Sequence, residues 1–115
     1  MSHQGSCHCG KIAFEFEGEV GKAIECNCSL CSRRGYLLTF VPSANFTLKT
    51  DAANLSTYRF NKEVIAHQFC ATCGCAPFGE GQDGQGNKMI AVNLRCVEGI
   101  DPAELSVHKV DGRSK

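Results

Sequence analysis

The chain has 115 residues and a balanced charge, because 12 Lys and Arg face 12 Asp and Glu and give a formal net charge of zero at pH 7. This balance argues against a protein that holds nucleic acid or an anionic membrane through counterion release, and no apolar run approaches the roughly 18 residues that cross a bilayer. The length suits a single domain over residues 1–115. The opening residues lack the basic-then-apolar pattern of a signal peptide, so we expect a cytoplasmic protein.

Short strands dominate the predicted elements, which indicates an all-β domain. Ile12, Phe14 and Phe16 alternate with less apolar residues, the period-2 pattern of a half-buried strand. One or two helical turns are expected at residues 29–35, and no segment keeps a 3.6-residue period. Further strands are predicted where β-branched and aromatic residues are bounded by Gly, Pro, Asn or Asp, at residues 37–41, 46–49, 56–60, 89–94 and 105–110.

A glycine-rich segment at residues 79–84 matches the pattern G-x-G-x-x-G. A dinucleotide-binding fingerprint needs a strand before this pattern and a helix after it. Here a strand-like run follows instead. We therefore predict a mobile glycine-rich loop at residues 79–84 and no dinucleotide cofactor.

The nine cysteines are the unusual feature of the composition. A secreted disulfide scaffold usually has an even number of cysteines and a shorter chain. The odd count favours a reduced chain whose thiolates bind metal, and zinc is the metal we expect. Thiol pairs without metal, with one disulfide among them, are the alternative.

The two outer cysteine pairs could form one closed zinc site. Its four thiolates would come from Cys7, Cys9, Cys70 and Cys73. Gly10 and Gly74 directly follow the pairs, and glycine supplies the positive φ that brings backbone amides toward thiolate sulfurs. On an extended chain, Cys7 and Cys9 would point to the same side. Four thiolates leave no position for a substrate, so this site would be structural and would link segments about sixty residues apart.

The middle cysteines suggest a site of a different kind. Cys26, Cys28 and Cys31 place three thiolates within six residues. Catalytic zinc sites have three protein ligands and an open fourth position, which also suits an incoming thiolate. A closed site is the alternative, with its fourth ligand taken from His67, Cys75 or Cys96.

Several other residues have more than one interpretation. His67 could be a metal ligand, a proton shuttle or a structural histidine. Arg33 and Arg34 could meet a substrate carboxylate, although solvation at the surface is expected for at least one of them. We expect Cys75 and Cys96 to be small buried residues and His8 to point away from the metal.

Three motifs occur in order along the chain. They read Cys7-His8-Cys9-Gly10 before the alternating strand, Cys26-Asn27-Cys28-Ser29-x-Cys31, and His67-x-Phe69-Cys70-x-x-Cys73-Gly74. Together they resemble the glutathione-dependent formaldehyde-activating enzyme family, and residues 26–74 are most similar to its branch that includes centromere protein V. The resemblance spans nearly the whole chain.

This resemblance implies a β-rich Mss4-like fold with two zinc ions. It assigns Cys7, Cys9, Cys70 and Cys73 to the structural ion and the three middle cysteines to the catalytic ion. The implied activity is that of a carbon–sulfur lyase that joins glutathione and formaldehyde as S-hydroxymethylglutathione. A small thiol is then the partner, rather than nucleic acid or a membrane. The alternatives are a non-catalytic zinc-stabilised binding module and a methionine sulfoxide reductase with Cys96 as its nucleophile.

Overall fold

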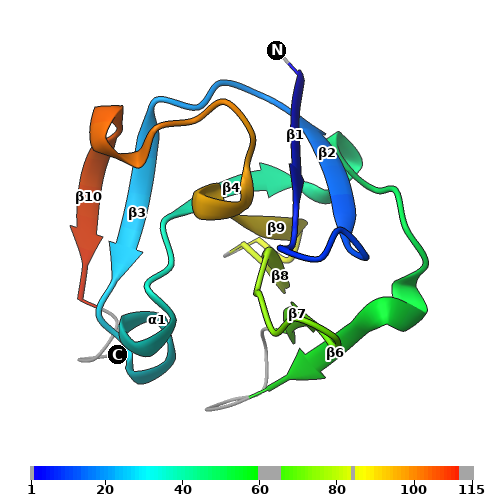
Figure 1. Ribbon diagram of the computed structural model, residues 1–115. Coiled ribbons are helices and arrows are strands. Elements are labelled where there is room, and N and C mark those ends of the chain that lie inside the picture. Colours follow the sequence, from blue (N-terminus) through cyan, green and yellow to red (C-terminus); the bar gives the residue numbers. More distant parts are fainter. Residues whose placement is uncertain (1, 60–65, 84, 112–115) are drawn as a thin grey trace.

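Two β-sheets and one short helix form the described part of the chain, which is residues 2–59, 66–83 and 85–111 of a computed structural model (Figure 1). The predicted all-β class is confirmed. The strands are β1 Ser2–Ser6, β2 Ala13–Glu17, β3 Lys22–Cys26, β4 Leu38–Pro42, β5 Phe46–Leu48, β6 Leu55–Tyr58, β7 Ala66–Cys70, β8 Phe78–Gln82, β9 Lys88–Asn93 and β10 Ser106–Val110. The helix is α1 Ser29–Arg34, and single 3-10 turns occur at Ser43–Asn45, Ala52–Asn54, Leu94–Cys96 and Pro102–Glu104.

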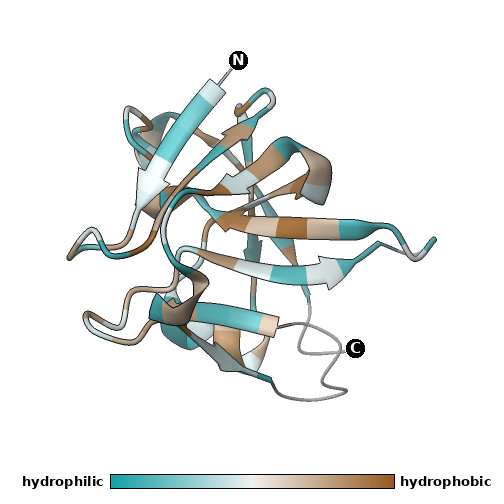
Figure 2. Cartoon of the chain, turned by 90° about the vertical axis from the view of Figure 1, so that its right-hand side faces the viewer, coloured by the Kyte–Doolittle hydropathy of each residue, from teal (hydrophilic) through white to brown (hydrophobic). Residues whose placement is uncertain are grey.

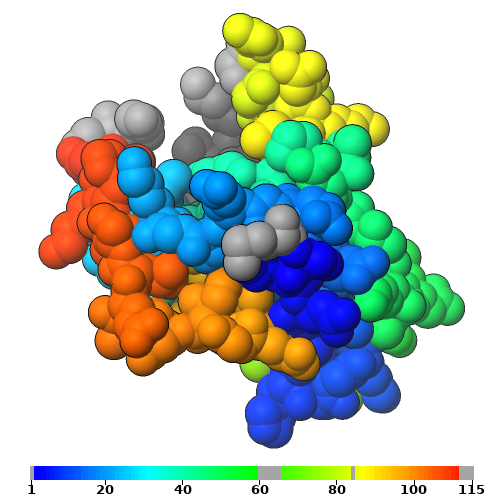
Figure 3. Space-filling model, turned by 90° about the horizontal axis from the view of Figure 1, so that it is seen from above, coloured from blue at the N-terminus to red at the C-terminus, as the bar shows by residue number. Residues whose placement is uncertain are grey.

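The two sheets differ in size and direction of pairing. The small sheet has the order β1-β2-β5, and the large sheet has the order β10-β3-β4-β9-β8-β7-β6. The strands of both sheets pair in antiparallel fashion, apart from β10, which runs parallel to β3. A bridge between Gly5 and Val97 joins β1 to the segment after β9. Seen from above in Figure 3, the blue N-terminal residues accordingly lie against the orange ones.

Aromatic rings from both sheets meet in the core. Ile12, Phe14 and Phe16 are at most 1% exposed, so the predicted alternation is confirmed. The ring of Phe78 in β8 lies 6.2 Å from that of Phe14 and 4.8 Å from that of Phe46, measured between centroids. In Figure 2, brown, apolar residues are concentrated in the inner strands, whereas β1, next to the N-terminus, is teal and white. These ring contacts therefore help to hold the two sheets together.

None of the helices in the described residues is long and apolar enough to cross a bilayer.

The predicted strands agree with β2, β4, β5, β6, β9 and β10 to within two residues at each end, although residue 60 lies outside the described part. The loop predicted at residues 79–84 is wrong for residues 79–82, which belong to β8. Gly79 and Gly81 belong to β8 and pair with Ala91 and Met89 of β9. Pairing on both sides of β8 outweighs the low strand propensity of glycine. Gly84 lies outside the described residues.

Gly5 lies where β1 passes closest to the core, which allows a stability test. A Cβ atom at this position would overlap the ring of Phe14 and lie 2.6 Å from the carbonyl oxygen of Cys96. We expect Gly5→Ala to lower the free energy of unfolding by about 1–3 kcal/mol, because a buried ring and the backbone must both shift. Denaturant unfolding measures this change.

Gly21→Ala is the matched control, since nothing lies within 4 Å of the Cβ it would add. This variant should keep the stability of the wild type or exceed it slightly, because alanine restricts the unfolded chain. Equal stability of the two variants would contradict the close approach of β1 to the core.

Candidate metal centres

Four cysteine sulfurs meet where the two sheets approach each other. The Sγ atoms of Cys7, Cys9, Cys70 and Cys73 all lie within 4.8 Å of one another. Cys7 directly follows β1 of the small sheet, whereas Cys70 is the last residue of β7 in the large sheet. This outer cluster therefore connects the sheets across 61 residues of sequence.

The sulfur spacing of the outer cluster fits a tetrahedral metal. The Sγ atom of Cys9 lies 3.7 Å from that of Cys7 and 3.5 Å from that of Cys70. Zn–S bonds of about 2.3 Å would separate tetrahedral sulfurs by about 3.8 Å, whereas a disulfide holds its sulfurs at about 2.05 Å. All nine cysteines, which lie in the described residues, are free thiols. The four residues could thus hold zinc, and the disulfide alternative is not supported.

Both outer cysteine pairs lie in turns that the following glycine allows. Gly10 has φ +84° and Gly74 has φ +81°, as the sequence predicts. The extended geometry expected for Cys7 and Cys9 is wrong, because residues 8 and 9 form a turn. The turn lets the amide of Ile12 donate to the Cys7 sulfur at 3.3 Å. An extended chain would carry that amide away from the sulfur.

Backbone amides also favour the thiolate form in the second turn. The amides of Thr72 and Cys73 each donate to the Cys70 sulfur at 3.4 Å. Hydrogen bonds from the amides of Cys75 and Cys9 lower the pKa of Cys73 to about 5. Hydrogen bonds to the charged form of a group stabilise that form. The second turn is therefore suited to present thiolates to a cation.

The middle cysteines form a second group, the triad of Cys26, Cys28 and Cys31, whose sulfurs lie within 4.8 Å of one another. Cys26 ends β3, Cys28 is the N-cap of α1, and Cys31 lies in its first turn. The amide of Cys28 donates to the Cys26 sulfur at 3.4 Å, and the amide of Cys31 donates to the Cys28 sulfur at 3.3 Å. The predicted helix is confirmed, and it ends at Gly35 with φ +66°. The turn from β3 into a short helix thus brings the three sulfurs close together.

The triad needs a positive charge before all three sulfurs can ionise. Burial raises the pKa of Cys31, and the neighbouring Cys28 and Cys26 raise it further. Burial also opposes ionisation of Cys28, but hydrogen bonds from Cys31 and Cys26 outweigh it and lower the pKa of Cys28. Three thiolates at this spacing repel one another, so a bound cation would release protons as it binds. This donor set fits zinc held by three sulfurs.

The residues proposed as a fourth ligand do not join the triad. Within the described ranges, no further His, Cys, Asp or Glu side chain completes this group. Burial raises the pKa of Cys96 to about 11, and the nearby charges that add to this shift are those of Cys75, Cys7 and Cys73. Cys96 therefore lies toward the outer cluster. Cys75 and Cys96 are half-buried, not fully buried as expected.

His67 lies beside the triad without being part of it. The ring of His67, on β7, stacks against Tyr36 with 6.5 Å between centroids. Burial lowers the pKa of His67, and the charge of Arg34 lowers it further. The imidazole is therefore neutral at pH 7, and its role as a proton shuttle stays a prediction.

The two arginines after the triad have separate surroundings. Arg33 is exposed and donates to the carbonyl oxygen of Ser29 at 2.9 Å. Arg34 donates to the hydroxyl oxygen of Tyr36 at 2.8 Å, and its guanidinium lies over the ring of Phe69 at 5.4 Å. Arg34 thus fixes Tyr36 beside the triad. Tyr36 was not predicted from the sequence, because its contact with Arg34 depends on the turn at the end of α1.

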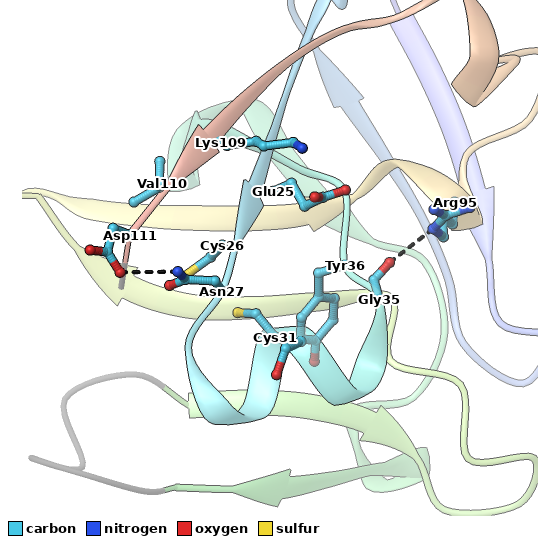
Figure 4. A pocket seen from close by; sticks show the side chains of 11 residues that line it. Glu25, Cys26, Asn27, Cys31, Gly35, Tyr36, Arg95, Lys109, Val110 and Asp111 are labelled. Carbon is cyan, nitrogen blue, oxygen red and sulfur yellow. Dashed lines mark hydrogen bonds between the residues drawn. The ribbon is translucent and has the colours of Figure 1, made fainter. Parts of the chain in front are cut away.

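Two hollows adjoin the triad, and Cys26, Cys31, Tyr36 and Val110 line both of them. The polar hollow has a volume of about 480 Å³, and its charged side chains are Glu25, Arg95, Lys109 and Asp111 (Figure 4). The apolar hollow has a volume of about 260 Å³, and its apolar side chains include Ile24, Leu38, Phe40 and Ala91. Sequence reasoning missed the charged and the apolar lining residues, because β3, β4, β9, β10 and the turn Leu94–Cys96 bring them together only in the folded chain.

The chain is similar to known proteins in both sequence and structure. The sequence model of the family described as glutathione-dependent formaldehyde-activating enzyme matches residues 2–108. The crystal structure of a Rhodobacter sphaeroides protein is similar to this chain, with 30% sequence identity and a TM-score of 0.78. The similarity covers 91% of this chain and 99% of that one. The family match therefore extends over the outer cluster and the triad.

Removal of a sulfur from the outer cluster should destabilise the fold. We expect Cys73→Ser to lower the melting temperature by about 10 °C or more, because a structural zinc contributes about as much free energy as a small domain's net stability. Cys75→Ser is the matched control, two residues away and outside both groups. Thermal unfolding of the zinc-loaded variants measures the difference, and equal melting temperatures would contradict a structural metal here.

Removal of a sulfur from the triad should change metal content and leave the fold intact. We expect about two zinc ions per chain in the wild type and about one in Cys31→Ser, because three-sulfur binding is lost while the outer cluster persists. Elemental analysis gives the stoichiometry, and circular dichroism checks the fold. A variant that keeps both ions would show that Cys31 is not a ligand.

Proposed function

This chain belongs to the glutathione-dependent formaldehyde-activating enzyme family, and we propose that it is a zinc-dependent carbon–sulfur lyase. In the synthetic direction the reaction joins glutathione and formaldehyde as S-hydroxymethylglutathione. The triad is the observation that supports this proposal, because three sulfurs converge at the border of two hollows. A metal held by three sulfurs keeps a position open for a reactant, whereas the four sulfurs of the outer cluster would leave no open position.

The reaction is an addition to a carbonyl group. The thiol sulfur forms a bond to the carbonyl carbon, the C=O double bond becomes a C–O single bond, and the thiol proton passes to that oxygen. Zinc held by Cys26, Cys28 and Cys31 would supply a Lewis-acidic position that favours the thiolate form of glutathione near neutral pH. No oxidant or reductant takes part.

The polar hollow can bind the charged ends of the thiol substrate. Glutathione carries two carboxylates and one ammonium group at neutral pH, and the hollow presents both cationic and acidic side chains. The Nε atom of Arg95 donates to the carbonyl oxygen of Gly35 at 2.8 Å, which holds the guanidinium at the wall (Figure 4). Its remaining N–H groups and the ammonium group of Lys109 suit carboxylates. Binding there would orient the thiol toward the triad.

Tyr36 lines both hollows. Its side chain is 4% exposed, and burial raises its pKa, so the phenol is protonated at neutral pH. The hydrogen bond from Arg34 and the stacked ring of His67 hold Tyr36 in place. A fixed, neutral side chain beside the triad would give the reactants a rigid surface to bind against.

The number of sulfur ligands distinguishes this proposal from the binding-module alternative. A purely structural module predicts four protein ligands at the middle site as well. In the part of the chain that the structure describes, three side chains meet there. This difference favours the lyase.

Exchange between glutathione and formaldehyde provides the direct test. We expect zinc-loaded protein to accelerate the exchange, as measured by proton NMR of the adduct. Cys31→Ser should reduce the rate on the order of 100-fold or more, since even indirect damage to a metal site costs 10–100-fold. The control Cys75→Ser, whose sulfur belongs to neither group, should keep the wild-type rate. The proposal fails if no common cellular thiol shows acceleration.

A further inference from the structure

A row of residues across the large sheet forms the apolar hollow. Phe40 of β4 pairs with Ala91 of β9, Ala91 pairs with Gly79 of β8, and Gly79 pairs with His67 of β7. Paired residues of antiparallel strands share one face of a sheet. Two small residues therefore lie between two large ones. The small pair makes the floor of the hollow, and Phe40 and His67 make its sides.

This row lies on the face of the sheet that does not face the core. The neighbours of the row, Phe78, Ile90 and Val92, are buried in the core, and side chains alternate along a strand. Phe40 itself is 48% exposed, although it is a large apolar residue. The triad and Tyr36 also line the hollow. An apolar recess with an exposed phenylalanine at its border thus opens directly beside the proposed reacting atoms.

Formaldehyde is too small and too polar for this recess. A volume of about 260 Å³ corresponds to roughly nine water molecules at about 30 Å³ each, whereas formaldehyde has two non-hydrogen atoms. Its hydrogen substituents would leave most of the apolar lining without contact. A hydrocarbon substituent of four to six carbons would fill the recess and remove Phe40 from water.

The difference in charged side chains between the two hollows indicates which reactant each hollow binds. The polar hollow contains charged side chains of both signs and suits the thiol, as argued above. The apolar hollow, on the other side of the shared residues Cys26 and Tyr36, remains for the carbonyl compound. We propose, on the basis of the proposed function, that the preferred carbonyl substrate is an aldehyde with an aliphatic or aromatic substituent that binds over Ala91 and Gly79.

The bonds formed and broken are those of the proposed reaction. The thiol sulfur adds to the aldehyde carbon, the carbonyl oxygen takes the thiol proton, and the product is a hemithioacetal. The substituent takes no part in bond changes. It contributes binding through apolar contact, so it should act on affinity and on kcat/KM.

A series of stable adduct analogues tests the binding without requiring turnover. The probes are S-methyl-, S-butyl- and S-hexylglutathione, whose Kd values for zinc-loaded protein are measured by calorimetry. We expect affinity to rise about two- to fourfold per added CH₂ group, since full burial of one CH₂ contributes about 0.8 kcal/mol. Equal affinity along the series would overturn the inference.

Ala91→Leu fills the floor of the hollow and tests the location. This variant should remove the dependence on chain length, because a leucine side chain would occupy the space of the substituent. Ala103→Leu is the matched control in the exposed turn Pro102–Glu104 and should keep that dependence. A dependence that persists in Ala91→Leu would overturn the assignment to this hollow.

Turnover separates this inference from the proposed function. With glutathione as thiol, kcat/KM should rise from formaldehyde through butanal to hexanal and benzaldehyde. Activity with formaldehyde that falls with longer aldehydes would overturn the inference and leave the proposed function intact. Absence of acceleration with every aldehyde would remove the proposed function and the substrate assignment together, whatever the Kd series shows.

Discussion

The outer cluster of Cys7, Cys9, Cys70 and Cys73 links the two sheets, and a metal held there would be the contact on which the rest of the structure depends. It joins the end of β1 in the small sheet to the end of β7 in the large one. A chain of this length buries a modest core, here a set of aromatic rings between the sheets. A metal that closes a long loop removes conformational freedom from the unfolded chain and holds strands that have few neighbours. In the small sheet, which has three short strands, a metal at this link would add to the ring contacts that pack it against the large sheet.

The triad, unlike the outer cluster, does not link the two sheets. Its three sulfurs come from one continuous segment, so a metal there would constrain only the turn between β3 and α1. Loop closure within six residues contributes little to global stability. The position of the triad is instead set by β10 and β4, which flank β3 in the large sheet. In the proposed function, this division of the cysteines into a four-sulfur and a three-sulfur group separates structural support from reactivity.

Local patterns in the sequence predicted what depends on local geometry. Alternation identified β2, cysteine spacing identified both groups, and Gly10 and Gly74 indicated turns with positive φ. The strands that escaped prediction lack apolar alternation. In β7, for example, the buried position of Gln68 is satisfied by hydrogen bonds to Thr57 at 2.7 Å and to Glu80 at 2.9 Å. Such a pattern looks polar until the neighbouring strands are in place, so only the tertiary structure identifies it as a core strand.

The glycines of β8 show why the hollows could not be predicted. In the local sequence, Gly79 and Gly81 indicate a loop, because glycine has a low strand propensity. In the folded sheet, Gly79 pairs with Ala91 on one side and with His67 on the other. A side chain at Gly79 would project into the apolar hollow that the triad also lines. Because glycine has no side chain, that space stays open. The same residue that misleads a local interpretation thus determines the shape of the site, since a recess on a sheet depends on register between strands distant in sequence.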